Sequence, residues 1–326
     1  MSQKAQTRTA STTVHAPMPE NPQTGRYAIG IDLGGTKIAA GLVELPAARI
    51  ITKEIIPTRP ERGGEAVLRD TLDVARRLHA QAARLALPVC GIGVGICELV
   101  NLEGEIRSDY LIKWRELPAQ RALSEIAPTR FESDARAPAM AEARYGAGVA
   151  YRNFIYLTIG TGISYCLVLD GKPYAGAHGN AIIAASGILS SDCESCGTTL
   201  DRSLEDYAAG PALVARYNHR TGAALTTGMQ VTAAAAAGDA VAIEVVTSAG
   251  AACGNTAGFL INALDPQALI VAGGLGLAAG LYWDSFVAST RRRIWAEENR
   301  GLPIVPAQLA LEAGLIGAAL CAPGGA

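Results

Sequence analysis

The sequence predicts an α/β protein built of two related lobes. Apolar strands and amphipathic helices alternate along the chain, as is typical of α/β folds. A strand, a glycine turn and a second strand begin at residue 27 and recur about 130 residues later. The 326 residues also suit roughly two domains of about 150 residues each. We expect residues 27–130 to form a small lobe, joined by a C-terminal helix at about 310–323, and residues 131–309 to form a larger lobe.

The first lobe is predicted to begin with three strands and a helix. Residues 27–32 (YAIGID) predict a buried strand, residues 38–45 the returning strand of a hairpin, and residues 51–58 a third strand. Apolar residues between 65 and 87 have the spacing of an amphipathic helix, which Pro88 ends. The apolar run VCGIGVGI after this proline predicts a further strand.

The second lobe repeats this arrangement. The segment FESD ends a strand at Asp134, and a helix from Ala135 to Tyr145 follows it. FIYLTIG and YCLVLDG predict two strands around a glycine turn. From Leu204 onward the chain is predicted to be largely helical, until the apolar strand ALIVAGGLG (268–276) runs into glycine.

The composition excludes several classes of protein. A hydrophobic content of 49% with 18% charged residues rules out disorder for most of the chain, although the polar residues 1–26 predict a disordered tail. The formal net charge is −2 and no basic run is present, so we expect no nucleic-acid partner. Seven cysteines spread over the chain indicate a reducing cytoplasm, and no apolar run predicts a membrane span.

Three glycine loops follow predicted strands, and glycine is enriched in the chain, with 36 residues. Glycines let backbone N–H groups approach a phosphate, and loops at the carboxyl ends of neighbouring strands converge on one ligand. Neither a Walker loop nor a GxGxxG motif is present, and a glycine pair in a hairpin can also be only a turn. The predicted nucleotide-binding residues are Asp32, Gly34, Gly35, Thr36, Lys37, Gly160, Thr161, Gly162, Gly273, Gly274 and Gly276.

Several segments in order resemble the ROK family of sugar kinases and repressors. They include IGIDLGGTKIAAGLVE, GIGVG, ESDAR, IYLTIGTGIS, LEDYAAGPAL and LINALDPQALIVAGGLG, and the resemblance runs from about Tyr27 to about Ala319. It implies the two-lobed actin-like, hexokinase-like (ribonuclease H-like) fold with a cleft between the lobes. It also implies ATP as phosphoryl donor, Mg²⁺ bound with ATP near Asp32, and a homodimer. A repressor would need a helix-turn-helix unit before the first glycine loop, and residues 1–26 have no such pattern.

The resemblance identifies Asp134 as the general base that takes the proton from the attacking hydroxyl. A free aspartate has a pKa near 4, so it is ionised at neutral pH and needs only correct placement. Because Asp134 immediately precedes a predicted helix, it is also a candidate N-cap, and both roles can coexist.

The acceptor side departs from the family pattern. The family motif NDAN is Ser133-Asp134-Ala135-Arg136 here, and a sugar-binding glutamate and histidine are replaced by Ile183 and Ser186. Glu205 matches a family glutamate, and His178 lies on the substrate-proximal loop. The predicted acceptor-binding residues are thus Ser133, Asp134, His178, Ile183, Ser186 and Glu205.

These changes predict altered specificity. We expect a kinase for the primary hydroxyl of a sugar-like acceptor other than plain glucose, such as the C7-cyclitol 2-epi-5-epi-valiolone or the amino sugar kanosamine. An inactive pseudokinase that binds nucleotide or sugar, and an ordinary hexose kinase, are the alternatives.

The zinc-binding segment of the family is incomplete in this chain. Only Cys193 and Cys196 remain of its cysteines, and Ser203 stands where the last cysteine would fall. Four-coordinate zinc therefore lacks its ligands, and we expect no structural metal there.

Overall fold

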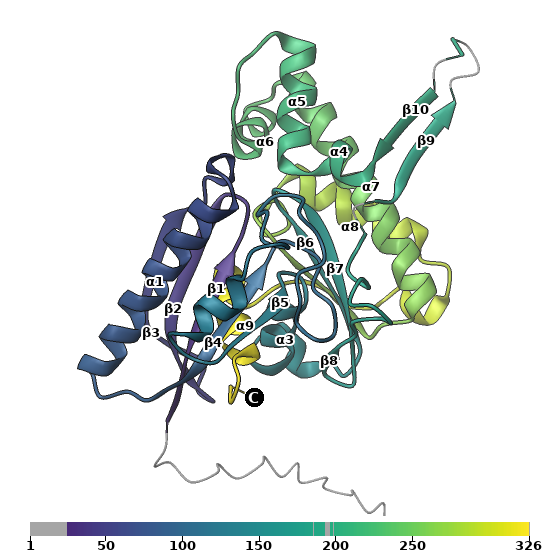
Figure 1. Cartoon of the computed structure of the whole chain (residues 1–326). Helices are drawn as coiled ribbons and strands as arrows, with labels where there is room; N and C mark the ends of the chain where they lie inside the picture. The colour runs from purple at the N-terminus through teal and green to yellow at the C-terminus, as the bar shows by residue number, and fades with distance from the viewer. Residues whose placement is uncertain (1–24, 185, 193–195, 198, 326) are drawn as a thin grey trace, which may run out of the picture.

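The computed structural model describes residues 25–184, 186–192, 196–197 and 199–325. Two five-stranded sheets, each with helices packed on it, form the two lobes of the chain (Figure 1). Of the predicted disordered tail, residues 1–24 lie outside the described residues, and Arg26 already belongs to the first strand.

The first sheet has the strand order β3-β2-β1-β4-β5, in which β1, β4 and β5 are parallel. Its strands are β1 (Arg26–Leu33), β2 (Lys37–Leu45), β3 (Arg49–Pro57), β4 (Val89–Ile96) and β5 (Thr129–Ser133). Alternate residues of β1 point to opposite faces. Ile29 and Ile31 pack in the core beneath α1 (Gly64–Arg84), whereas Ala28 packs on the opposite face with Leu315 of α9 (Ala313–Cys321).

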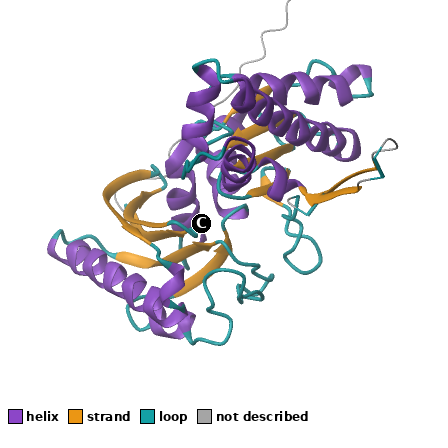
Figure 2. Cartoon of the chain, turned by 90° about the horizontal axis from the view of Figure 1, so that it is seen from above, coloured by secondary structure: helices purple, strands orange, loops and turns teal. Residues whose placement is uncertain are grey.

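The second sheet has the order β12-β11-β6-β7-β8. Its strands are β6 (Phe154–Ile159), β7 (Ile163–Leu169), β8 (Lys172–Pro173), β11 (Ala268–Ala272) and β12 (Ile304–Pro306). Its helices are α4 (Leu204–Ala208), α5 (Gly210–Thr221), α6 (Gly228–Ala236), α7 (Ala240–Leu264) and α8 (Leu281–Arg293). Figure 2 shows α1 standing apart from this large group of helices.

Two helices lie between the sheets. Helix α3 (Arg136–Tyr145) packs along α9, and Ala139 of α3 belongs to the core on the inner face of the second sheet. Short helices complete the chain: α2 (Ala119–Ser124) and the 3₁₀ turns Pro60–Arg62, Ala147–Ala150, Glu297–Asn299 and Ala310–Glu312.

A hairpin of β9 (Ile188–Asp192) and β10 (Thr199–Ser203) extends from the larger lobe at the upper right of Figure 1. The sequence predicted no strand here. Cys193 lies outside the described residues, and Cys196 is exposed. Within the part of the chain that the structure describes, no group of three or more His, Cys, Asp or Glu residues is placed to hold a metal ion.

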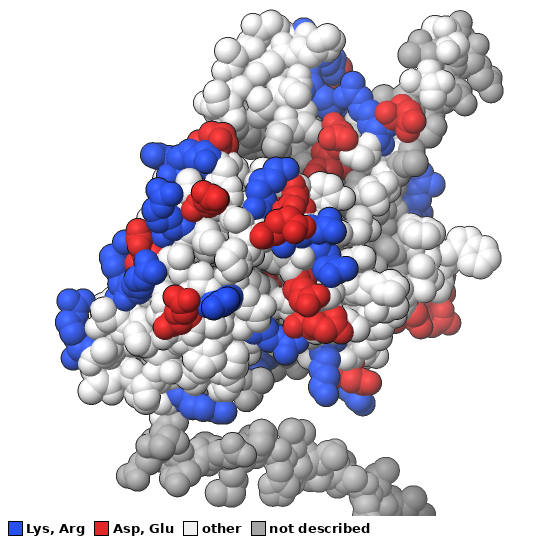
Figure 3. Space-filling view, viewed as in Figure 1, with Lys and Arg blue, Asp and Glu red and all other residues white. Residues whose placement is uncertain are grey.

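The predicted strands 27–32, 38–45 and 51–58 are confirmed within two residues at each end. The predicted helix 65–87 ends early, at Arg84, because Ala86 takes a left-handed backbone conformation with φ of 54°. Among the described residues, no single helix is both long and apolar enough to cross a membrane; α6 and α7 meet that test only as a pair, bent by 117°. On the face in Figure 3, basic and acidic side chains are interspersed.

Candidate functional site

The candidate site lies at the carboxyl edge of the first sheet, where three parallel strands end in register. Leu33 of β1 pairs with Ile96 of β4, which pairs with Ser133 of β5. Beyond this line, the Cys97 N–H donates to the Leu33 carbonyl at 3.2 Å, and the Asp134 N–H donates to the Ile96 carbonyl at 3.1 Å. The ladder therefore brings the first glycine loop and Asp134 to one edge, although about 100 residues separate them in sequence.

Asp134 is free of the capping role that its position before α3 suggested. The N–H groups of Ala135 and Arg136 donate instead to Ser133 Oγ, at 3.1 and 3.4 Å. Ser133 is fully buried, and its predicted place in the acceptor site stays a prediction. The Asp134 carboxylate is partly exposed and available for another role.

The surroundings of Asp134 favour its protonated form. Burial raises the pKa of its carboxyl to about 7, and the negative charges of Asp32, Glu98 and Glu205 add to this effect. A group with a pKa near the operating pH is suited to exchanging protons with a substrate.

Asp32 lies at the end of β1, against the first turn of α9. A Cβ built on Gly314 would come within 2.5 Å of its Oδ2, so glycine is needed for this close approach. Burial raises the pKa of Asp32 to about 6, and the nearby Lys37 and Lys53 oppose that shift. Asp32 and Asp134 are thus neighbouring carboxyl groups with similar pKa values, about 6 and about 7.

The first glycine loop forms a tight turn between β1 and β2. The Gly34 N–H donates to the Lys37 carbonyl at 3.1 Å, and the buried Thr58 hydroxyl donates to the Gly34 carbonyl at 2.6 Å. Thr36 and Lys37 are exposed. This geometry leaves both side chains accessible to a ligand.

The second and third glycine loops are brought together. The N–H groups of Leu275 and Gly276 donate to the Ile159 carbonyl at 3.0 and 3.1 Å, and a Cβ on Gly160 would lie 3.6 Å from the Gly274 nitrogen. Gly274 has open space on its Cα, as a backbone facing a ligand would require. The two loops form one backbone surface at the carboxyl ends of β6 and β11.

Glu205 supports the second loop from α4. Its Oε2 accepts the Ile163 N–H at 2.8 Å and lies against Gly162. Its negative charge also acts on Asp134. Glu205 therefore connects the second loop with the carboxylates of the first sheet edge.

Glu98 is a site residue that sequence reasoning missed. It is 3% exposed, and its carboxylate accepts the N–H groups of Tyr110, Leu111 and Ile112 at 2.6–2.9 Å, together with the Ser108 hydroxyl. These bonds hold a loop whose Leu111 side chain lies directly against Gly35. A charged residue immediately after an apolar strand was the available signal.

The remaining predicted acceptor residues lie on the segment after β8. His178 and Ser186 are exposed, and Ile183 is 47% exposed although it is apolar. Ile182 is buried, and its carbonyl accepts the Tyr165 N–H at 3.2 Å, which anchors this segment to β7.

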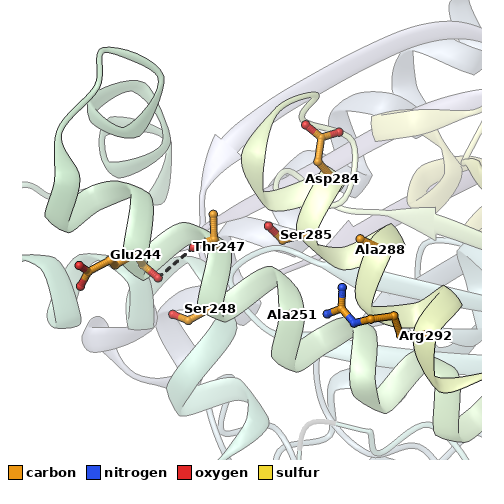
Figure 4. A pocket seen from close by; sticks show the side chains of 8 residues that line it. All are labelled: Glu244, Thr247, Ser248, Ala251, Asp284, Ser285, Ala288 and Arg292. Atoms are coloured by element: carbon orange, nitrogen blue, oxygen red, sulfur yellow. Dashed lines mark hydrogen bonds between the residues drawn. The ribbon is translucent and has the colours of Figure 1, made fainter.

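A separate hollow of about 670 Å³ lies between α7 and α8 (Figure 4). Small side chains such as Ser248 and Ala288 line it, with Glu244, Asp284 and Arg292 around them. None of the predicted site residues is among its lining residues.

Comparisons with known proteins agree with this architecture. A model of the ROK family matches residues 28–324. Glucokinase from Streptomyces coelicolor is 29% identical over 314 residues, which cover 89% of this chain and 96% of that protein. N-acetylmannosamine kinase from Citrobacter koseri is 28% identical over 302 residues, covering 91% and 98%.

A solved structure extends the comparison to the fold. The ROK family glucokinase from Streptomyces griseus, in complex with glucose and AMPPNP, is 29% identical with a TM-score of 0.77, over 92% of this chain and 100% of that chain. The two sheets described above correspond to the two lobes of such kinases. The chain belongs to the ROK family, and it has that family's two-lobed actin-like fold.

Proposed function

We propose that this protein is an ATP-dependent kinase that transfers the γ-phosphoryl group to a primary hydroxyl of a sugar-like acceptor. The observation that carries the proposal is the position of Asp134. It stands in line with the first glycine loop at one sheet edge, and the N–H groups at the start of α3 donate to Ser133. A carboxylate so placed can accept the hydroxyl proton as the oxygen attacks phosphorus.

The glycine loops are the proposed nucleotide site. Phosphoryl transfer depends mainly on positioning and on stabilising charge on the phosphate oxygens. Open space at Gly274 lets a phosphate approach the backbone of the paired loops, and the exposed Thr36 and Lys37 offer side-chain donors from the other lobe. The relatives named glucokinase and N-acetylmannosamine kinase support this assignment.

The carboxylates at the edge of the first sheet fit a magnesium ion that arrives with ATP. Mg²⁺ is usually held by one or two protein carboxylates, with phosphate oxygens and water completing its coordination, so no dedicated cluster is needed. Asp32, beside the first glycine loop, is the residue that would hold it. When bound, the ion would neutralise charge on the phosphates.

The acceptor is proposed to be a C7-cyclitol such as 2-epi-5-epi-valiolone, or an amino sugar such as kanosamine. Ile183 and Ser186 replace a family glutamate and histidine, and the half-exposed Ile183 side chain can form no hydrogen bond to a sugar hydroxyl. A lost hydrogen bond of the charged kind is worth about 1.5–3 kcal/mol. Glucose should bind correspondingly less well.

An acceptor panel tests this proposal. Purified protein with Mg·ATP should form ADP with a C7-cyclitol or an amino sugar faster than with glucose, and the double variant Ile183→Glu, Ser186→His should shift the preference toward glucose. If the wild type turns over glucose as fast as the C7-cyclitol and the amino sugar, the protein is an ordinary hexose kinase. If no acceptor in the panel gives ADP above the level of Asp134→Asn, the pseudokinase alternative is favoured. The apolar Ile183, in place of a family glutamate, is the observation that supports that alternative.

We also propose that the protein works as a cytoplasmic homodimer, as the family resemblance implies. Sedimentation equilibrium over a range of protein concentrations should give twice the mass of 33.7 kDa. A mass equal to that of one chain at all concentrations would contradict the homodimer.

A further inference from the structure

Arg136, the first residue of α3, is a buried arginine whose side chain is 3% exposed. Arginine is rarely buried to this extent unless its donors are paired, because desolvating an unpaired charge is costly. The partners of Arg136 therefore explain why the chain retains a charged residue there.

Each part of the guanidinium group has a partner. Nε donates to Glu132 Oε1 at 2.6 Å, and Nη2 lies 2.5 Å from the same oxygen. Nη2 also donates to the Val100 carbonyl at 2.8 Å, and Nη1 donates to the Gly179 carbonyl. Glu132 thus fixes the plane of the guanidinium, and the two Nη atoms of Arg136 donate to two backbone carbonyls.

The two carbonyls belong to different lobes. Val100 follows β4 of the first sheet, and Gly179 follows β8 of the second sheet, next to His178. The loops also touch directly, because a Cβ on Gly179 would overlap the Val100 carbonyl oxygen, and Gly179 has a φ of 82° that favours glycine. Arg136 therefore holds the two lobes together at the acceptor-side loop.

We infer that Arg136 is a positioning residue that fixes the segment 174–183 on the small lobe before an acceptor binds. This segment carries His178 and Ile183, two of the proposed acceptor-binding residues, so its position sets where their side chains lie. The second glycine loop is supported separately by Glu205, which leaves the nucleotide side independent of Arg136. The kinetic readout of this inference rests on the proposed function, whereas its structural readout does not.

The test compares Arg136→Met and Arg136→Lys with the control Arg130→Met. Arg130 lies on β5, is exposed, and its Nη2 donates to the Leu102 carbonyl at 3.4 Å, within the small lobe. Arg136→Met should raise the acceptor KM about tenfold or more, since charged hydrogen bonds are lost, while the ATP KM changes less than about twofold. Arg136→Lys should recover part of the loss, and Arg130→Met should match the wild type.

Hydrogen–deuterium exchange of the nucleotide-free, acceptor-free chain gives the second readout. Amides in 174–183 should exchange about tenfold faster in Arg136→Met, with those of β6 unchanged. Unchanged exchange in 174–183 overturns the inference, as does a uniform increase over the whole chain. If Arg136→Met does not fold, Gly179→Ala tests the same contact from the other side and should give the same pattern. If the wild type phosphorylates nothing, the exchange result still stands, and only the proposed function fails.

Discussion

Replacing Asp134 by asparagine should stabilise the folded protein while removing its proposed base. The pKa of the Asp134 carboxyl is about 7 in the folded chain, whereas an aspartate in an unfolded chain titrates near 4. The folded state thus binds this proton more tightly than the unfolded state. Stability is therefore lost as the pH rises from about 4 to about 7, where the carboxyl must ionise within the fold.

The size of the effect follows from the pKa difference. The pKa of Asp134 differs by about 3 between the folded and the unfolded chain, and each pKa unit corresponds to about 1.36 kcal/mol, so the gain in the free energy of unfolding has an upper limit of about 4 kcal/mol. Asp134 is partly exposed, and water screens its charge, so we expect a gain of about 1–3 kcal/mol for Asp134→Asn above pH 7.

Urea unfolding between pH 5 and pH 8.5, without nucleotide or Mg²⁺, measures this gain. The free energy of unfolding of the variant should exceed that of the wild type, by a difference that grows up to about pH 7 and then stays constant. Asp73→Asn, on the exposed surface of α1, serves as the control and should not change the pH profile. If wild type and Asp134→Asn show parallel profiles, the raised pKa of Asp134 is refuted.

Two further predictions concern the neighbouring carboxylates. The pKa of Asp32 is about 6, so the affinity for Mg·ATP should fall more steeply between pH 7 and pH 5 in the wild type than in Asp32→Asn. Calorimetric titration measures this affinity. An identical pH dependence of the two proteins would contradict a role for Asp32 near the metal. Glu98→Gln should lower the free energy of unfolding by about 1–3 kcal/mol, because the new side-chain amide can accept fewer of the bonds that hold 108–112. The exposed Glu103→Gln is the control, and equal thermal melts of the two variants would contradict this role of Glu98.

Much of the fold could be predicted from local patterns. The strands β1, β2 and β4 are apolar runs, and α1 has the amphipathic spacing of a surface helix, so their type follows from the sequence. The hairpin of β9 and β10 was missed because its residues, such as Ser190 and Asp201, lack the apolar alternation that marks a strand.

The site could be predicted only in part. Glycine loops stand out because glycine marks the turns that follow strands, whereas Asp134 was identified through the family resemblance. Which of Ser133 and Asp134 accepts the N–H groups at the start of α3 could not be predicted, since both precede the helix and only the observed bonds to Ser133 distinguish them. Glu98 and Arg136 act through long-range backbone contacts, to Leu111 and to Gly179, which no local pattern encodes.

Single-turnover phosphoryl transfer by wild type and Asp134→Asn tests the central claim most directly. Both proteins are mixed at pH 8 with saturating Mg·ATP and the best acceptor of the panel, after their nucleotide affinities have been measured. We predict equal nucleotide affinity, rapid formation of phosphorylated acceptor by the wild type, and a loss of about 10²-fold or more in the variant. Equal transfer rates in the two proteins would contradict the assignment of Asp134 as the base.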